Sequence, residues 1–201
     1  IVMLGNSLTE RRAFYELTPV KKHNIVMLGN SLTERGLWGE YFQPAYVLNR
    51  GIGGDCVSGM IARLETILSG KPKAMFIMAG TNDLIFSKTS YEKLLEQYER
   101  MLDIIARESP RTKVYIQSLL PLVEDRQDYF KGKNKRIAGF NAVLREMAER
   151  RNLPYIDIWS AIQNNGALPE EFTHDGIHLT GPGYAVWVET LRPYMKPYMK
   201  K

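Results

Sequence analysis

The sequence predicts an α/β protein, built as a three-layer α/β/α sandwich around a parallel sheet of about five strands. Five short apolar runs lack the polar alternation of a strand with one wet face, as expected when helices cover both faces of a sheet. Helical patterns with one apolar face separate these runs. Strands that alternate with helices form βαβ units, whose right-handed crossovers place the strands parallel in one sheet.

Each expected element corresponds to a stretch of the chain. The strands are expected at Ile25–Leu28, Tyr46–Leu48, Ala74–Met78, Val114–Leu119 and Tyr155–Ile158. The helices are expected around Val57–Leu68, Tyr91–Ile105, Ile137–Met147 and Tyr184–Leu191. Thr89 and Glu92 have the spacing of a capping box before the second helix, and Pro182 suits the first turn of the fourth.

The composition is typical of one globular domain. The chain has 201 residues, of which 44% are hydrophobic and 24% charged, enough to form a sizeable core. Its longest apolar run, Ala74–Ala79, is too short to span a membrane, and no signal-peptide pattern opens the chain. A single cysteine, Cys56, excludes an internal disulfide and leaves the compartment open.

The net charge of +5 raises the question of a nucleic-acid partner. Basic residues gather at 131–136 beside Tyr129 and Phe130, and this combination can contact nucleic acid or an anionic surface. No recognition motif accompanies the cluster. The favoured interpretation is a solvated loop that leads into a helix, and no nucleic-acid partner is predicted.

Polar, turn-forming segments follow four of the predicted strands. They are Gly29–Leu32 after the first strand, Asn49–Asp55 after the second, Gly80–Asp83 after the third and His174–His178 beyond the fifth. In a parallel α/β sheet, ligands bind beyond the carboxyl ends of the strands. We therefore expect these segments to converge on one edge of the sheet and to form the functional site.

The residues of these segments permit acyl transfer. Ser31 supplies a hydroxyl where a strand turns into a helix, and His178 can accept its proton while Asp175 orients the other ring nitrogen. Gly54 and Asn82 offer an unobstructed N–H and a side-chain amide, which suit an oxyanion hole. Each signal has an ordinary alternative, because a serine in this position often caps a helix, and glycines and asparagines often form turns.

A metal site is the alternative for the last segment. His174, Asp175 and His178 offer two histidines and a carboxylate, which suffice for some zinc sites. Gly176 argues against a regular helix that would direct the two histidines at one ion. We therefore predict neither a metal nor a cofactor.

The blocks GNSLTE, NRGIGGD, GTND and DGIHLT carry a family resemblance. In order and spacing they resemble the four sequence blocks of the SGNH hydrolases, also called the GDSL esterase/lipase family, over residues from about 24 to 193. The resemblance implies a flavodoxin-like fold and a serine esterase without metal or cofactor. It implies these roles: Ser31 as nucleophile, Asp175 and His178 as the rest of a triad, and an oxyanion hole of the Ser31 N–H, the Gly54 N–H and the Asn82 amide.

One position departs from the motif that gives the family its name. Asn30 stands where that motif has aspartate. The aspartate is not one of the four residues to which the family's catalysis is assigned, so the change bears on fine positioning and not on the reaction. The residues of the four blocks are most similar to those of platelet-activating-factor acetylhydrolase-like and sialate O-acetylesterase-like members.

The segment at 121–134 precedes the third predicted helix and is expected to overhang the site. It is mostly charged, with Tyr129 and Phe130 as its aromatic residues, whereas a long acyl chain needs a larger apolar groove. The predicted substrates are therefore short-chain esters, acetyl above all, of a small polar alcohol such as a sugar. A lysophospholipase or thioesterase with the same triad is one alternative, and a non-catalytic binding module on the same fold is the other.

The stretch IVMLGNSLTER occurs at 1–11 and again at 25–35, so Ser7 and Ser31 stand in the same local context. Only the second copy leads directly into the second predicted strand and Gly54, which makes Ser31 the expected reactive serine. We therefore predict an N-terminal extension at 1–23 and a hydrolase domain at 24–201, whose tail also repeats, as PYMK. Duplications at both ends favour an artificial origin of the repeats over an evolved functional site. The alternative is a first copy that adds as an edge strand or exchanges within a homodimer.

Overall fold

The computed structural model describes residue 11 and residues 13–199. At its centre lies one parallel sheet with the strand order β2-β1-β3-β4-β5. The strands are β1 (Ile25–Gly29), β2 (Val47–Gly51), β3 (Ala74–Met78), β4 (Lys113–Gln117) and β5 (Tyr155–Ile156). The predicted α/β class and parallel sheet are confirmed, and the order is that of flavodoxin-like folds.

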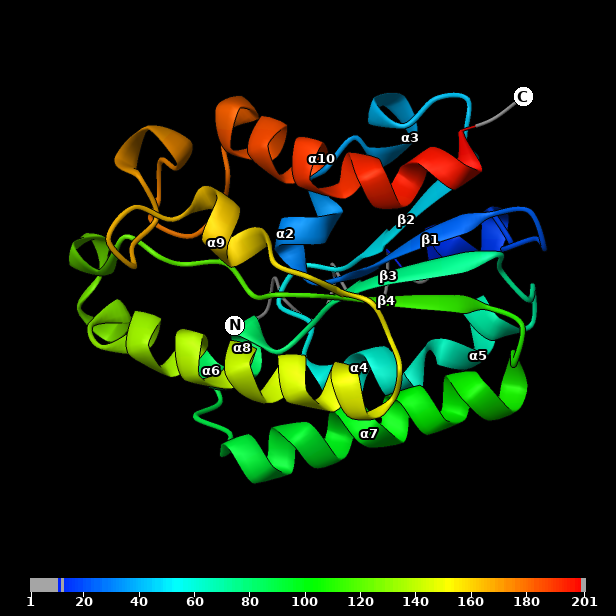
Figure 1. Cartoon of the computed structure of the whole chain (residues 1–201), viewed down its shortest axis with the longest axis horizontal. Helices are drawn as coiled ribbons and strands as arrows, with labels where there is room; N and C mark the ends of the chain where they lie inside the picture. Colours follow the sequence, from blue (N-terminus) through cyan, green and yellow to red (C-terminus); the bar gives the residue numbers. More distant parts are fainter. Residues whose placement is uncertain (1–10, 12, 200–201) are drawn as a thin grey trace.

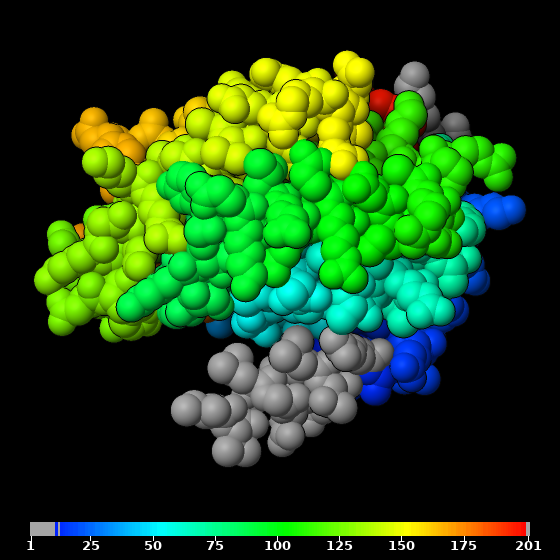
Figure 2. All heavy atoms as spheres, turned by 90° about the horizontal axis from the view of Figure 1, so that it is seen from below, coloured from blue at the N-terminus to red at the C-terminus, as the bar shows by residue number. Residues whose placement is uncertain are grey.

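Helices cover both faces of the sheet, which makes three layers (Figure 1). On one face lie α2 (Ser31–Glu34), α3 (Trp38–Tyr41), α9 (Ile158–Ile162) and α10 (Gly181–Met195). On the other lie α4 (Val57–Ala62), α5 (Leu64–Leu68), α6 (Thr81–Ile85), α7 (Tyr91–Glu108) and α8 (Lys133–Arg150). Figure 2 shows this second face, where α7 lies between α8 and α4. Short 3₁₀ turns occur at 124–126, 128–130, 170–172 and 196–198.

The central strands show why the apolar runs have no polar alternation. Every residue of β1 and β3 is buried, because helices pack on both sides of these two strands. Met27 and Phe76 are 0% exposed. Burying a large apolar side chain of this kind contributes ~1.5–3 kcal/mol relative to leaving it in water. The core therefore fixes β1 and β3, and with them the segments that follow.

Only β3 has the predicted bounds at both ends, and β4 ends at Gln117, two residues before the predicted Leu119. Two other differences in the strand boundaries have a clear cause. β5 stops at Ile156, because the Asp157 side chain accepts a hydrogen bond from the Ser160 N–H at 3.0 Å and starts α9. β2 runs on to Gly51, so Asn49 and Arg50, expected in a loop, lie in the strand. An edge strand tolerates such polar residues where they find partners, and both do.

The short helices α2, α3, α6 and α9 were not predicted. Two further differences concern the predicted helices themselves. The helix expected at 57–68 divides at Arg63, whose φ of −114° and ψ of 6° leave the helical range while its side chain turns into the core. The helix α7 is capped by Ser90, whose side chain accepts from the Lys93 N–H, so the capping box of Thr89 and Glu92 is wrong. Pro182 lies in the first turn of α10, as predicted.

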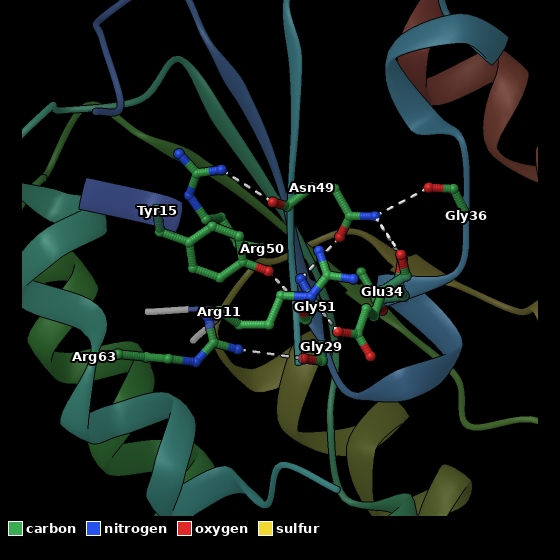
Figure 3. A network of polar contacts seen from close by, with 10 residues as sticks. Arg11, Tyr15, Gly29, Glu34, Gly36, Asn49, Arg50, Gly51 and Arg63 are labelled. Atoms are coloured by element: carbon green, nitrogen blue, oxygen red, sulfur yellow. Dashed lines mark hydrogen bonds and ion pairs between the residues drawn. The ribbon is translucent and has the colours of Figure 1, made fainter. Parts of the chain in front are cut away.

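The described part of the N-terminal segment packs beside β2. Residues 13–17 are helical. The Tyr15 hydroxyl donates a hydrogen bond to the carbonyl of Gly51, and the guanidinium of Arg50 lies 4.5 Å from the centre of the Tyr15 ring (Figure 3). The second copy of the repeat forms β1, whereas Ser7 lies outside the described residues. The predicted domain boundary after residue 23 stays a prediction.

The repeated tail packs against β4. Tyr194 from the first PYMK copy and Tyr198 from the second place their ring centres 6.1 and 6.4 Å from that of Tyr115. The hydroxyls of Tyr115 and Tyr198 are 2.9 Å apart. Both described tyrosines of the repeat therefore belong to the packed structure.

Candidate active site

The register of the sheet brings the ends of three strands to one level. Gly29, at the end of β1, pairs with Gly51 on one side and with Met78 on the other. The three segments that follow these strands therefore leave the sheet side by side. They carry, in order, Ser31, Gly54 and Asn82. Such a place, where neighbouring connections diverge, is the usual binding site of an open parallel sheet.

Ser31 is the first residue of α2, but it does not cap that helix. The cap is Asn30, which is 1% exposed and whose Oδ1 accepts the N–H of Leu32 at 3.0 Å. Asparagine and aspartate serve equally well as helix caps, so Asn30 meets the structural need at this position without a charge. The Ser31 hydroxyl is consequently left for other contacts.

A line of contacts joins Ser31, His178 and Asp175. The Oγ of Ser31 lies 2.9 Å from Nε2 of His178, and Nδ1 of the same ring lies 2.5 Å from Oδ2 of Asp175. The other carboxylate oxygen of Asp175 accepts the N–H groups of Ile177 at 3.0 Å and His178 at 2.8 Å. The structure thus brings together the three residues that the sequence nominated, with the imidazole held between a hydroxyl and a carboxylate.

The charge of Asp175 follows from these contacts. Burial raises the pKa of the carboxyl group, but hydrogen bonds from the His178 ring and from the N–H groups of His178 and Ile177 outweigh it and lower the pKa to about 2. Asp175 is therefore a carboxylate at neutral pH. A carboxylate at Nδ1 favours the tautomer with hydrogen on Nδ1, which leaves Nε2 as a proton acceptor facing Ser31.

Gly54 and Asn82 lie on the wall of the same cavity as Ser31. Gly54 has a φ of +74°, in the left-handed region that favours glycine. Asn82 is 6% exposed, and its Nδ2 donates to the carbonyl of Asp55 at 2.9 Å. The second N–H of this amide has no acceptor among the described residues. It is therefore available to a ligand in the cavity.

The cavity has a volume of about 370 Å³. Besides the residues nominated from the sequence, the segment expected to overhang the site contributes Gln127, Tyr129 and Phe130 to its wall. Gly53 and Ile177 also line it, and both belong to segments that the sequence assigned to the site. The lining residues that were not foreseen from the sequence are Glu34, Arg35 and Phe86.

Asn49 is a further residue that sequence reasoning did not single out. Its Nδ2 lies 3.0, 2.9 and 3.0 Å from the carbonyl oxygens of Thr33, Glu34 and Gly36, at the end of α2 (Figure 3). The Tyr184 hydroxyl donates to the Leu32 carbonyl, inside the same helix, at 2.6 Å. These contacts hold the short helix that begins with Ser31, and Gly51 lets it approach the sheet, because a Cβ there would lie 2.2 Å from the N atom of Glu34.

A buried ion pair lies behind the site. Arg63 Nε is 2.9 Å from Asp55 Oδ2. Arg63 also donates to the carbonyl of Gly29 at 3.2 Å, a contact that Figure 3 shows. Gly29 precedes the turn that carries Ser31, Asp55 follows Gly54, and the carbonyl of Asp55 holds the Asn82 amide. The pair therefore connects the three segments that follow β1, β2 and β3.

The alternative of a metal site finds no donor cluster. Within the described residues, no three His, Cys, Asp or Glu side chains are grouped as metal ligands. His174 is exposed, and both ring nitrogens of His178 already contact Ser31 and Asp175.

Among the helices of the described part of the chain, none is long and apolar enough to cross a membrane.

Comparison with known proteins gives consistent relatives. Residues 3–186 match the model of the GDSL-like lipase/acylhydrolase family. The platelet-activating factor acetylhydrolase IB subunit alpha2 of Rattus norvegicus is 29% identical over 153 residues, which cover 74% of this chain and 64% of that relative. The chain thus spans less than two thirds of the length of this relative.

Solved structures show the same fold. A GDSL-like lipase from Bacteroides thetaiotaomicron has a TM-score of 0.82 at 22% identity, and the match covers 94% of this chain and 97% of that one. A lipase/acylhydrolase from Enterococcus faecalis has a TM-score of 0.72 at 24% identity, with 89% and 97% covered. With the family model matching most of its length, this chain belongs to the GDSL-like lipase/acylhydrolase family.

Proposed function

We propose that this chain is a serine esterase that hydrolyses short-chain carboxylic esters, acetyl esters above all, through an acyl-enzyme. The observation that carries the proposal is the continuous line of contacts from Asp175 through His178 to Ser31 on the wall of a cavity. A hydroxyl, a base and a carboxylate that orients the base are the parts that nucleophilic acyl transfer requires.

The proposed acylation begins when Ser31 Oγ attacks the ester carbonyl carbon while His178 Nε2 takes the hydroxyl proton. The carbonyl oxygen becomes an oxyanion, for which the N–H groups of Ser31 and Gly54 and the amide of Asn82 are the proposed donors. The intermediate collapses as His178 passes the proton to the leaving alcohol. Water then attacks the acyl-enzyme while His178 takes a proton from it. His178 returns this proton to Ser31 Oγ, which releases the acid and restores the Ser31 hydroxyl.

The cavity wall supports a short acyl group. Glu34, Arg35 and Gly53 line it beside Ser31, and two of these are charged while the third has no side chain. Each methylene of a longer chain gains ~0.8 kcal/mol only where it is buried against apolar surface. The name of the matched relatives refers to acetylhydrolysis, which is consistent with an acetyl group here.

The test compares the wild-type protein with Ser31→Ala on p-nitrophenyl acetate. The proposal expects turnover by the wild type and a rate at the buffer background for the variant, with both proteins folded by circular dichroism. If the two proteins were equally inactive on a panel of acetyl, long-acyl and thioester substrates, the chain would be a binding module on this fold and not an enzyme.

A further inference from the structure

Two aromatic side chains stand exposed on the wall of the catalytic cavity. Phe86 is 55% and Tyr129 53% exposed, and their ring centres lie 5.7 Å apart at an angle of 48°. Among the large hydrophobic side chains that are exposed in the described part of the chain, these are the two that line this cavity. Exposed aromatic rings cost solvation free energy, so a pair kept open beside a reactive serine indicates a ligand that covers it.

Both aromatic residues are anchored by contacts with their neighbours. Phe86 follows α6, the helix that carries Asn82, and its N–H donates to the Asn82 carbonyl at 3.0 Å. Tyr129 packs edge-to-face on Phe130 with 4.7 Å between ring centres, and Phe130 is 1% exposed. The backbone of Phe86 and the ring of Tyr129 are therefore each anchored beside the cavity.

The position of Tyr129 indicates which part of an ester, the alcohol or the acyl group, the two aromatic rings would contact. Its segment rests on the loop of the histidine, where the Val123 N–H donates to the Gly176 carbonyl at 2.9 Å. His178 must protonate the leaving alcohol, so the alcohol lies on the histidine side of Ser31. The charged residues Glu34 and Arg35 are left to line the acyl side.

Resting on the esterase function proposed above, we propose that Phe86 and Tyr129 form the subsite for the alcohol part of the ester, and that this alcohol carries a ring with an apolar face. A sugar ring and an aryl ring share this chemistry, since both present C–H groups or a π face to an aromatic side chain. Gln127, on the same wall, offers an amide to the hydroxyl groups of a sugar, which favours a sugar ring.

The experiment keeps the acetyl group constant and varies the alcohol. The substrates are a mono-O-acetyl methyl glycoside, phenyl acetate and ethyl acetate, and the proteins are wild type, Phe86→Ala, Tyr129→Ala and Tyr129→Phe. Tyr46→Ala is the matched control, because Tyr46 is 67% exposed and does not line the cavity. The quantity compared is kcat/KM for each ring acetate divided by kcat/KM for ethyl acetate.

The proposal predicts that this ratio falls roughly tenfold in Phe86→Ala and Tyr129→Ala, equivalent to about 1.4 kcal/mol of transition-state binding. Tyr129→Phe keeps the ring and should keep most of the ratio, and Tyr46→Ala should match wild type. A larger drop for the glycoside than for phenyl acetate identifies a sugar as the alcohol, and the reverse identifies an aryl alcohol. A ratio that is unchanged in both Phe86→Ala and Tyr129→Ala would overturn the subsite.

Failure of the subsite and failure of the esterase function are distinguishable. A wild type that hydrolyses acetates with an unchanged ratio in the variants contradicts the subsite alone. Binding gives a second readout without turnover, by saturation-transfer NMR of the acetyl glycoside with Ser31→Ala. That signal should weaken when Tyr129→Ala is added, and an equal signal in both proteins would contradict the subsite whether or not the chain is an esterase.

Discussion

Arg63 and Asp55 form a buried ion pair, with 2.9 Å between Nε and Oδ2 and only 4% of each side chain exposed. The cost of removing these charges from water is several kcal/mol per ion, so such a pair persists only where its geometry and added hydrogen bonds offset that cost. Here the added bonds include the one from Arg63 to the Gly29 carbonyl. The pair thus ties the turn before Ser31 to the residue after Gly54.

The first prediction concerns this pair. Arg63→Met removes the guanidinium that pairs with the Asp55 carboxylate and should destabilise the protein by ~3–5 kcal/mol in urea unfolding. The double variant Arg63→Met/Asp55→Asn should lose less than the sum of the two single variants, because it removes both charges. Strictly additive losses would show that the two side chains are not energetically coupled.

The second prediction concerns Asn82. Asn82→Ala should lower kcat by roughly 10²–10³, the usual loss for one oxyanion donor, while KM changes little. The same change deletes the hydrogen bond to the Asp55 carbonyl, which should cost ~1 kcal/mol of stability. Melting temperature and both kinetic constants are measured on one preparation. A stability loss with kcat intact would mean that Asn82 only holds its turn.

The third prediction concerns Asp175. Asp175→Asn should lower kcat by roughly 10⁴ with the fold retained, because an amide no longer fixes the tautomer of His178. Its carboxyl pKa of about 2 is below the ordinary ~3.9, so its contribution to stability is present above pH 4 and is lost as the pH falls towards 2. The difference in melting temperature between wild type and Asp175→Asn should therefore shrink below pH 4. A difference that stays constant down to pH 2.5 would contradict this assignment.

The fourth prediction concerns acyl length. In a series of p-nitrophenyl esters, kcat/KM should be highest for acetate or propionate and should fall by octanoate. With Glu34 and Arg35 on the acyl side, as proposed above, added methylenes find little apolar surface there, so the gain of ~0.8 kcal/mol per buried methylene should be absent. A steady rise through octanoate would indicate an apolar groove and a lipase or lysophospholipase.

The fold and the principal site contacts could be predicted because they depend on local patterns. Buried runs such as Ala74–Met78 have one interpretation in a chain of alternating helices and strands, and polar segments after such strands must meet at one edge. Ser31 lies far from Asp175 and His178 in the sequence, but it stands just after the first predicted strand, and the other two stand in a polar loop shortly before the last predicted helix. The sheet then brings them together.

The residues that were missed act through tertiary contacts that leave no local pattern. Arg63 has the sequence context of a surface helix residue, and only the packed structure shows its partner Asp55. Asn49 was assigned to a loop, since a polar residue lowers the expectation of a strand, yet at an edge its amide holds the end of α2. Phe86 belongs to no motif used in the sequence analysis, and its place in the cavity follows from the α6 helix.

The central claim is that Ser31 is the nucleophile, and covalent labelling tests it directly. The protein is treated with a fluorophosphonate, digested with trypsin and mapped by mass spectrometry. The two copies of the repeat are distinguishable, because the peptide with Ser31 begins at His23, after Lys22. We expect one label on that peptide, formed in parallel with the loss of p-nitrophenyl acetate hydrolysis, and no label in Ser31→Ala. A label on the peptide that contains Ser7, or full activity in Ser31→Ala, would contradict it.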